Sequence, residues 1–599
     1  MKQTRLYYIL AVFLMASMIL SACASSAAGN ATPPGGISTQ APTQGGAPTA
    51  ATTEAPTTAA TQSATQATTP AATQAGNPST SANTIIIGTT DSIASLDPAD
   101  AYATRDWELI KNISEGLLVW KPGTIDLAPG LATDLGTVSS DGLTYTFTLK
   151  DGIKFGDGTP LDATIYAQQL NRLLTIGPKC PNDVADSLAV PFVASITAPD
   201  SKTIVFTLKS PVAYFRQLLA TSPYVASDPK TFPTDKCVLF PTAPIYGVGP
   251  WYIDQYTQKE QVVLKPNPYY TGDLKPQVSE IIVRDYADPQ TMALAVQNGE
   301  IDVAWRILSP EQITPLKSIS GLTVGTINGG GIRYLIINHT MKPTDDLNVD
   351  KAIAAAIDRN EIVDTVYGGN VNPLYSMVPP GFLGASTSFD NIYQAPNIDQ
   401  AKKYLEASGY STSNPLKLDI WYPPEHYGAS TAAAMELIKK QLEATGEIQV
   451  NLQSQEWSTY VTALTGGQSY SVGLLGWFFD YPDSSNYLDP FVYNKGEGTN
   501  VTAPTTGSTY GTPMNDQIKL LVDLLSQADV EQDPAKRTQL YQQAQDLFAN
   551  NVVTIPLFFV AEHVVYRSNI HGSSTYATPE TLNIGPNIEF NYATLSKTP

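Results

Sequence analysis

Hydrophobic and polar residues follow two different periods between residues 84 and 565. Alternating or β-branched runs are typical of strands, and apolar residues three and four apart indicate helices. Strands are expected at Thr84–Gly88, Thr144–Leu149, Thr203–Leu208, Trp251–Ile253, Val262–Lys265, Glu280–Tyr286, Tyr334–Asn338, Leu416–Tyr422, Val450–Leu452, Ser471–Trp477 and Ile555–Val560. Helices are expected at Arg105–Leu118, Asp162–Leu174, Asp288–Asn298, Val349–Val366, Asp399–Ser408, Thr431–Thr445, Met514–Gln527 and Pro534–Asn550. Because both kinds of element mix along the chain, the pattern predicts an α/β fold.

The start of the sequence is typical of a secretory signal peptide. A short basic start precedes an apolar stretch, Leu6–Leu20, and small residues follow it. The Leu-Ser-Ala-Cys run at 20–23 resembles the lipobox of bacterial lipoproteins, which implies cleavage before Cys23 and a lipid on its thiol. The alternative is an uncleaved transmembrane anchor, but the apolar run is short for a span of about 20 residues. We therefore expect residues 1–22 to be a lipoprotein signal peptide and Cys23 to hold the mature protein on a membrane.

A flexible tether is expected at residues 23–83. After the cysteine the segment is almost entirely Ala, Thr, Gln, Ser, Pro and Gly, with Glu54 as the only charge and Ile37 as the only large aliphatic residue. Such a chain cannot bury enough apolar surface to offset its conformational entropy, so disorder is expected. A flexible tether of this length reaches roughly 40 Å. The globular part would therefore work at the extracytoplasmic face of a bacterial cell membrane.

Composition narrows the class of protein further. The part of the chain from about Thr84 is too long for one core, so two or three domains are expected. The formal net charge is −20, which argues against nucleic acid as a partner. The simpler explanation of this negative charge is that it keeps the protein soluble. The alternative explanation is an acidic surface that selects cationic ligands. The net charge therefore argues against a nucleic-acid partner but does not identify the ligand.

Two cysteines remain once Cys23 is lipidated. Cys180 and Cys237 form an even pair outside the cytoplasm, and a disulfide is the simplest state for such a pair. The four histidines are far apart in sequence, and no CxxC or HExxH motif is present. We expect no metal site and no cofactor.

Short runs spread over nearly the whole folded part carry a resemblance to a known family. They are Ser95–Ala99, Glu115–Leu118, Pro129–Ala132, Asp141–Phe147, Asp157–Ala163, Gly247–Trp251, Val263–Tyr270, Asn298–Asp302, Lys351–Ile353, Asp358–Arg359, Ala401–Leu405 and Gly409–Tyr410. Each run alone is weak evidence, but their order and spacing are specific. The chain resembles the substrate-binding proteins of peptide and nickel-type ABC importers, the dipeptide/oligopeptide-binding family (family 5), in its lipoprotein form.

The resemblance implies a periplasmic-binding-protein-like fold of two lobes joined by a hinge, with one lobe split into two domains. The implied segments are 84–125, 243–338 and 566–599 for the main domain of the first lobe, 126–242 for its small domain and 339–565 for the second lobe. The crossovers between lobes would lie near Tyr334–His339 and Val560–Arg567. Ligand would be enclosed at the interface by a hinge motion, since contacts made only in the closed state favour closure.

The run from Trp477 to Asp483 is the most informative local match. Peptide-binding members of the family place an aspartate three residues after this tryptophan and pair it with the ligand's α-ammonium. Asp480 holds that place, and a buried carboxylate gains charge-assisted hydrogen bonds from a bound ammonium. The alternative is that Asp480 braces its own turn, because Pro482 follows closely. Trp477 would line the pocket or belong to the core.

The remaining candidates each have a structural alternative. Trp457 matches an aromatic residue that lines the pocket in peptide binders, and Tyr246 is a further candidate wall; core packing is the alternative for both. His426 lies near a position where some relatives place a basic group for the ligand carboxylate, although a surface histidine is the commoner case. Arg333, at the start of the expected crossover, could supply the same charge or brace the hinge in an ion pair.

One departure from the family concerns the carboxylate end of a ligand. Some oligopeptide binders carry an arginine shortly before the tryptophan, and here Val472–Leu475 fill that stretch. The amine end of the site is kept and the carboxylate end is altered. Longer peptides fit this pattern better than short free ones, and cationic or neutral ligands, sugars included, fit it as well.

Three functions compete. The first is a membrane-anchored solute-binding protein that delivers peptides to an ABC permease, acting as a monomer. The second is the same scaffold binding an oligosaccharide or another small solute. The third is an enzyme, which we do not expect because no Gly-x-Ser-x-Gly, Ser-x-x-Lys or zinc motif occurs. Fold does not determine ligand, so the choice between the first two depends on site residues.

Overall fold

The computed structural model describes residues 83–182, 184–306, 308–465, 470–492, 515–572 and 589–598. The expected signal peptide 1–22, the lipidation site expected at Cys23 and all but the last residue of the expected tether 23–83 lie outside the described residues. Within the described part, no helix is long and apolar enough to cross a membrane.

A mixed sheet of eleven strands forms the centre of the folded part. In spatial order its strands are β15 (Ile448–Ser454), β14 (Leu416–Tyr422), β16 (Val472–Trp477), β12 (Leu322–Ile337), β17 (Thr554–Arg567), β11 (Val303–Trp305), β1 (Thr84–Thr89), β10 (Glu280–Asp285), β9 (Gln261–Pro266) and β8 (Trp251–Thr257), with β13 (Val371–Pro373) beside β17. β14 is parallel to β15 and β16, and β1 is parallel to β10 and β11. The other pairs in this sheet are antiparallel, so the α/β class is observed.

Four hydrophobic cores group the elements into two lobes. The second lobe has one large core between Ile332 and Phe559. It packs the helices α8 (Leu347–Ala356), α9 (Arg359–Glu361), α10 (Ser388–Tyr393), α11 (Ile398–Ala407), α12 (Ser430–Glu443), α13 (Trp457–Thr465), α14 (Ser485–Leu488), α15 (Asp516–Val530) and α16 (Pro534–Asn550). In the first lobe, one core lies on β1 and β8–β11, and a smaller one lies under α6 (Pro289–Asn298) and α7 (Pro310–Leu316).

The fourth core belongs to a separate small sheet of the first lobe. Its order is β4 (Thr137–Val138), β5 (Thr144–Thr148), β7 (Thr203–Leu208) and β6 (Val193–Thr197). It is accompanied by β2 (Leu118–Trp120), β3 (Leu127–Pro129), α2 (Thr104–Ile113), α3 (Ala163–Thr175), α4 (Val184–Leu188) and α5 (Phe215–Leu218). This core extends from Ala99 to Val248 and takes in Tyr481 as well, so it includes residues outside the expected small domain 126–242. The strands β18 (Ile570–His571) and β19 (Ser596–Lys597) pair near the C-terminus.

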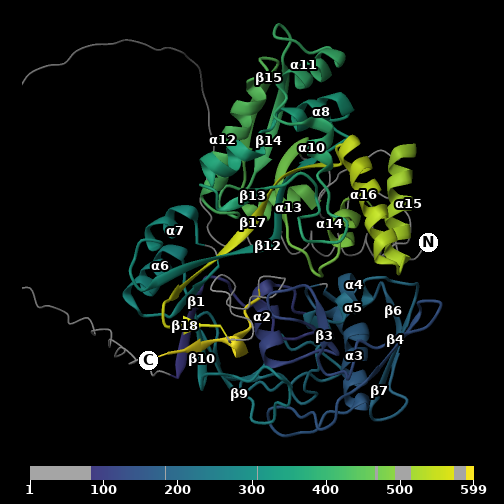
Figure 1. Cartoon of the computed structure of the whole chain (residues 1–599), viewed down its shortest axis with the longest axis vertical. Helices are drawn as coiled ribbons and strands as arrows, with labels where there is room; N and C mark the ends of the chain where they lie inside the picture. The colour runs from purple at the N-terminus through teal and green to yellow at the C-terminus, as the bar shows by residue number, and fades with distance from the viewer. Residues whose placement is uncertain are drawn as a thin grey trace, which may run out of the picture. The chain divides into compact units, whose positions relative to one another are not determined.

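The two longest strands connect the lobes. β12 and β17 pair antiparallel from Leu322↔Arg567 to Ile336↔Thr554, and the register shifts between Asn328 and Ile332. Figure 1 shows them side by side between the upper and lower groups of helices. Tyr334–Ile337 are already buried in the core of the second lobe, so β12 passes between the cores upstream of the expected crossover at Tyr334–His339. β17 crosses from the core of the second lobe to that of the first between Phe559 and Val564, which agrees with the expected crossover near Val560–Arg567.

One predicted helix, Val349–Val366, is broken in the structure. α8 ends at Ala356, and the chain restarts as α9 and a single π-helical turn at Ile362–Val366. Asp358 causes the restart because its carboxylate accepts a hydrogen bond from the backbone N–H of Glu361, at 3.0 Å, and so caps the new helix. Gln441 holds both backbone groups of Asp358 from α12, at 3.0 and 3.1 Å. A long-range contact therefore interrupts a periodic apolar pattern.

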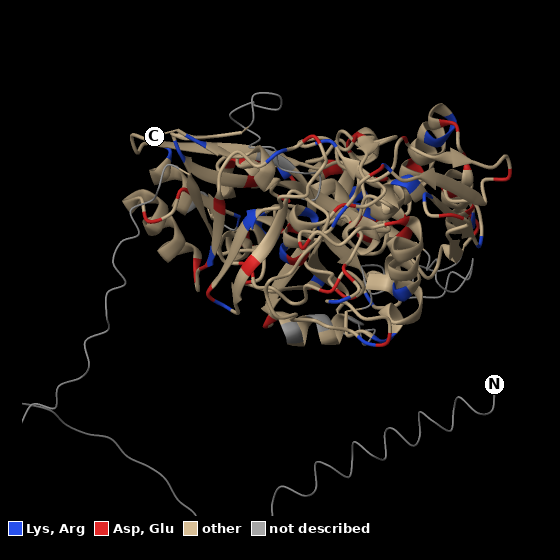
Figure 2. Ribbon diagram, turned by 90° about the horizontal axis from the view of Figure 1, so that it is seen from below, with Lys and Arg blue, Asp and Glu red and all other residues tan. Residues whose placement is uncertain are grey.

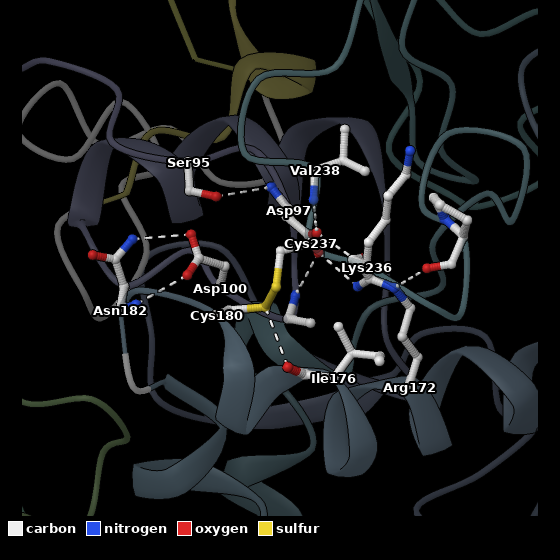
Figure 3. The surroundings of a disulfide bond; sticks show 12 residues. Ser95, Asp97, Asp100, Arg172, Ile176, Cys180, Asn182, Lys236, Cys237 and Val238 are labelled. Atoms are coloured by element: carbon white, nitrogen blue, oxygen red, sulfur yellow. Dashed lines mark hydrogen bonds and ion pairs between the residues drawn. A yellow bond between two sulfur atoms is a disulfide. The ribbon is translucent and has the colours of Figure 1, made fainter. Parts of the chain in front are cut away.

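A disulfide joins the two cysteines that the sequence analysis paired, Cys180 and Cys237, with a Cα–Cα distance of 5.9 Å. Figure 3 shows Asp97 beside it, between the guanidinium of Arg172 and the backbone N–H of Val238. Arg172 donates two hydrogen bonds to the Asp97 carboxylate, at 2.7 and 2.6 Å, and Val238 donates one at 2.8 Å. The disulfide and this buried carboxylate together hold the segment around residue 237 against the end of α3.

Charged residues do not separate into regions of one sign along the ribbon. Figure 2 shows lysines and arginines interspersed with aspartates and glutamates over the described part of the chain. The net charge of −20 therefore reflects a surplus of acidic residues that is spread over the molecule and not gathered in one region.

Candidate functional site

The turn after β16 lies where the second lobe meets the first. β16 ends at Trp477, which pairs with Ile332 of β12, and the chain then turns before α14. The ring of Tyr481 in this turn stacks on Tyr214 of the first lobe, with centroids 4.8 Å apart and planes 8° apart. Tyr481 belongs to the core of the small sheet. The run that the sequence analysis singled out is therefore also a point of contact between the lobes.

Asp480 is half-buried, with polar side chains from both lobes near it. Asn486 donates from its amide nitrogen to Oδ2 of Asp480 at 3.2 Å, and the charge of this carboxylate raises the pKa of Tyr102 in the first lobe. The Asn486 oxygen accepts hydrogen bonds from the Trp477 indole N–H at 3.1 Å and from the Asp480 backbone N–H at 3.2 Å. Burial raises the pKa of the Asp480 carboxyl to about 6. Trp477 and Asp480 therefore share one hydrogen-bonded group.

Asp483, three residues further on, is a structural residue. Its Oδ1 accepts hydrogen bonds from Arg537 at 3.0 Å, from the Tyr541 hydroxyl at 2.8 Å and from the backbone N–H of Ser485 at 3.0 Å. Both charged side chains are less than a tenth exposed. This ion pair fixes the turn to α16, as expected for a residue that braces the loop.

Arg333 lies on β12 beside the same turn. Its guanidinium is within 4.1 Å of the centre of the Tyr427 ring and 5.4 Å of the Phe478 ring, and Nη1 donates to the Ile332 carbonyl at 3.0 Å. Arg333 is 8% exposed, and burial lowers its pKa from the usual value. Among the described residues no carboxylate lies within ion-pair distance of it, but Glu562 of β17 is near enough for its charge to favour the charged guanidinium. The guanidinium thus remains charged in an aromatic setting, which is energetically favourable only when cation–π contacts or an anion offset its desolvation.

His426 and Trp457 form the aromatic wall next to Arg333. The imidazole stacks on the indole with centroids 3.5 Å apart and planes 2° apart, and Tyr427 lies 4.6 Å from the imidazole. Burial and the charge of Arg333 lower the pKa of His426 to about 4. His426 is therefore neutral near pH 7 and cannot act there as a cationic group for a carboxylate. Trp457 is half-buried at the start of α13, a helix that the sequence analysis did not predict.

Tyr246 has its contacts within the first lobe. Its ring lies 5.2 Å from the ring of Tyr252, and its side chain lies close to Gly156. Among the described residues, the structure groups Asp480 with Trp477 and groups Arg333 with His426 and Trp457. It does not bring Tyr246 to either group.

Sequence reasoning missed four residues that shape these two groups. They are Tyr102 and Asn486 at the carboxylate, and Tyr427 and Phe478 at the guanidinium. Phe478 is 43% exposed, which is unusual for a large apolar side chain beside a buried charge. In the sequence, only the position of Phe478 next to Trp477 drew attention to it. No local pattern pointed to the other three residues. In the described residues no group of three or more His, Cys, Asp or Glu could hold a metal ion.

Comparisons with known proteins agree with this architecture. The model of the family "Bacterial extracellular solute-binding proteins, family 5 Middle" matches residues 126–499. Oligopeptide-binding protein OppA of Bacillus subtilis (strain 168) is 28% identical over 469 residues, which cover 74% of this chain and 81% of that protein. Periplasmic murein peptide-binding protein MppA of Escherichia coli (strain K12) is 27% identical over 487 residues, covering 78% of this chain and 86% of that protein.

The solved structure of HbpA2 from Haemophilus parasuis has the same periplasmic-binding-protein-like fold. Its TM-score is 0.73 at 22% identity, and the match covers 86% of this chain and all of the other. The family match spans more than half of the sequence, and the two-lobed α/β fold is the one that similar solved structures share. This chain belongs to family 5 of the bacterial extracellular solute-binding proteins.

Proposed function

We propose that this protein captures peptides outside the cytoplasm and delivers them to an ABC importer. The observation that carries the proposal is the half-buried carboxylate of Asp480 in the turn after β16, near the contact between the lobes. The guanidinium of Arg333 lies on β12, which pairs with β16 just before that turn. A peptide carries one charge of each sign at its ends, and such a site complements both. The names of OppA and MppA, which refer to oligopeptides and murein peptides, support the same class of ligand. The protein would act as a monomeric carrier and not as an enzyme.

The ammonium of the peptide would bind at Asp480. Asn486 donates a hydrogen bond to Oδ2 of this carboxylate at 3.2 Å and so orients it. Burial makes the charged form of Asp480 costly, and a bound cation offsets that cost through charge-assisted hydrogen bonds. Asp480 would therefore select ligands that carry a free amine.

The acidic end of the ligand would bind at Arg333, because His426 is neutral near pH 7. The guanidinium lies 4.1 Å from the centre of the Tyr427 ring and 5.4 Å from that of Phe478, and a planar anion would form charge-assisted hydrogen bonds with it. A carboxylate at a ligand terminus or on a side chain has this geometry. This arrangement would replace the arginine that some relatives carry in the stretch occupied here by Val472–Leu475.

The alternative ligand is an oligosaccharide or another small solute that stacks on aromatic rings. The observation that favours it is the wall formed by Trp457, His426 and Tyr427 with the exposed ring of Phe478 nearby. Flat aromatic faces bind apolar ligand faces without requiring charge. The two ligand classes differ in whether they need Asp480.

A lipid on Cys23 would anchor the protein at the extracytoplasmic face of the cell membrane. The support comes from the Leu-Ser-Ala-Cys run and the apolar stretch before it, together with the polar composition of residues 24–83. Cys23→Ser should move the protein from washed membranes to the soluble fraction. Wild-type protein that stays in membranes without a lipid would contradict the anchor.

Native mass spectrometry of the purified protein, followed by a thermal-shift screen, tests the proposed ligand class. A ligand that binds only the folded state stabilises it by RT ln(1 + [L]/Kd), about 2.7 kcal/mol when the ligand is a hundredfold above its Kd. We expect a co-purified mass that matches a peptide and a shift with peptides but not with sugars. A shift with a sugar panel and none with a peptide library would establish the alternative.

A further inference from the structure

A cavity of about 100 Å³ lies within the first lobe, apart from the turn after β16. The end of α2, the strand β2 and the C-terminal segment at 589–591 border it. In Figure 1 the yellow C-terminal segment lies beside α2, and the Asn112 side chain joins the two by donating to the Phe590 carbonyl at 2.6 Å. The described residues that line the cavity include none of the two groups around Asp480 and Arg333. Since a cavity of about 150 Å³ is enough for benzene, this one has room for a ligand of a few non-hydrogen atoms.

Glu115 places a half-buried carboxylate in this cavity without a cation beside it. The Tyr270 hydroxyl donates to its Oε1 at 2.5 Å, and in the described part of the chain no basic side chain lies within ion-pair distance of it. Burial raises the pKa of the Glu115 carboxyl, and the charges of Lys150 and Lys275 oppose that effect from further away. The carboxylate would therefore be stabilised by any cation that enters the cavity.

The lysine of the cavity is already paired with another carboxylate. The ammonium of Lys111, at the end of α2, lies 2.9 Å from Oε2 of Glu589 and 3.8 Å from the centre of the Trp120 ring. The two charged side chains are 19% and 6% exposed, so solvent screens their attraction only weakly. Lys111 is thus held at Glu589 by an ion pair and a cation–π contact, and it does not neutralise Glu115.

The wall at Glu589 also has an acceptor without a donor. Its Oε1 is buried and has no hydrogen-bond partner among the described residues. Two neighbouring donors are used elsewhere, because the Asn112 amide donates to the carbonyls of Glu108 and Phe590 and the Phe590 N–H donates to Glu108 Oε2. The carboxylate of Glu108 is itself paired with Arg105 at 3.0 Å. The cavity therefore has more carboxylate charge and more acceptors than its own side chains satisfy.

We propose that this cavity binds a small organic cation, an alkylammonium ion, through the carboxylate of Glu115. The ammonium donates charge-assisted hydrogen bonds to Glu115, and the alkyl chain contacts apolar side chains of the lining such as Val119, Trp120 and Leu274. The carboxylates disfavour an anion, and a neutral ligand leaves Glu115 without a counter-charge. The site is separate from Asp480, so the inference does not depend on the proposed capture of peptides.

Saturation-transfer NMR with n-butylammonium as the probe tests this site. Because Asp480 is itself proposed to bind an amine, the titrations use Asp480→Asn protein. Butan-1-ol matches the probe in size and shape but has no charge. We expect n-butylammonium to bind saturably and butan-1-ol to bind about tenfold more weakly, since a hydrogen bond to a charged group is stronger than one between neutral groups.

Three further substitutions, each made in Asp480→Asn protein, locate the binding. Glu115→Gln keeps an acceptor for the Tyr270 hydroxyl and removes the charge, so affinity for n-butylammonium should fall about tenfold. Val119→Phe fills the cavity without changing its charges and should abolish binding. Val138→Phe makes the same change on β4, outside the cavity, and should leave affinity unchanged. A thermal melt of each variant checks its fold, and if Val119→Phe does not fold, Glu115→Gln and butan-1-ol still decide.

Three results would overturn the proposal. They are binding of n-butylammonium that does not saturate, binding of butan-1-ol as tight as that of n-butylammonium, and affinity in Glu115→Gln or folded Val119→Phe equal to that in Val138→Phe. All three leave the proposed role of Asp480 untouched, because its carboxylate is absent from every titration.

Discussion

The rings of Tyr214 and Tyr481 lie face to face across the two lobes, with centroids 4.8 Å apart and planes inclined by 8°. Tyr214 is 2% exposed and Tyr481 is 5% exposed, so water is excluded from between them. Next to this stack, the backbone N–H of Ala213 donates to the carbonyl of Asp529 at 2.7 Å. The ring stack therefore holds the turn that carries Asp480 against the first lobe, and the hydrogen bond joins α15 to the same lobe.

Loss of this stack should weaken ligand binding by loosening the closed state. Tyr481→Leu keeps an apolar side chain and removes the stacking, which is worth about 0.5–1.5 kcal/mol beyond area burial. We expect peptide affinity to fall about two- to tenfold, with a small change in melting temperature. Calorimetry and a thermal melt measure both. Unchanged affinity would show that the contact between Tyr214 and Tyr481 does not contribute to closure.

Binding of peptides with a free amine should depend on pH around 6. Burial raises the pKa of Asp480 in the free protein to about 6. A bound ammonium favours the ionised carboxylate, so the pKa of Asp480 is lower in the complex than in the free protein. Affinity should be full above pH 7 and should decline as the pH falls through 6, because a proton then competes with the ligand. N-acetylated peptides should show no such decline. A flat profile for the free peptide would contradict the assignment.

Two aspartates three residues apart should respond in opposite ways to the same substitution. Asp483→Asn weakens a buried ion pair with Arg537 and leaves the guanidinium without its counter-charge, at a cost of about 3–5 kcal/mol in the free energy of unfolding. Asp480→Asn removes a carboxylate whose charged form burial disfavours, so the free energy of unfolding at pH 7 should not fall. Chemical denaturation of both variants checks this contrast. Equal destabilisation would mean that Asp480 is a structural residue as well.

The disulfide should stabilise the first lobe. It closes a loop with a sequence separation of 57 residues, which in the chain-entropy model is worth roughly 3–4 kcal/mol. The double variant Cys180→Ser, Cys237→Ser should unfold at lower denaturant concentration while peptide affinity per folded molecule stays the same. A double variant as stable as the wild type would show that the contacts around Asp97 hold this segment without the disulfide.

Elements whose packing is local were predictable from the sequence. β7, β14 and α16 have the bounds that their patterns indicate, because each strand alternates between a buried and a more exposed face and Pro534 begins the helix. The break at Asp358 was not predictable, since a side chain of α12 stabilises it. Of β12 only Tyr334–Ile337 was predicted, and the Gly-rich stretch before Ile332, where the register shifts, separates these residues from the first part of the strand.

The candidate site was predictable only in part, for a related reason. Asp480 and Trp477 were found through a family motif, and the structure places them in one hydrogen-bonded group through Asn486. The stacking of Tyr481 on Tyr214 depends on two lobes meeting, and the sequence around either residue carries no sign of it. His426 was expected as a basic group, but its stacking on Trp457 and its closeness to Arg333 make it neutral. These contacts join residues that are far apart in the sequence, so the local pattern of hydrophobic and polar residues does not predict them.

The most direct test of the central claim is the affinity of wild-type protein and Asp480→Asn for one peptide in free and N-acetylated form. Removing one partner of a desolvated charge pair costs roughly 2–5 kcal/mol. The wild type should therefore bind the free peptide at least tenfold more tightly than the acetylated one, and Asp480→Asn should lose this preference while it remains folded. Equal binding of the two peptides by the wild type, or unchanged affinity in Asp480→Asn, would contradict the claim that this protein captures peptides by their amine.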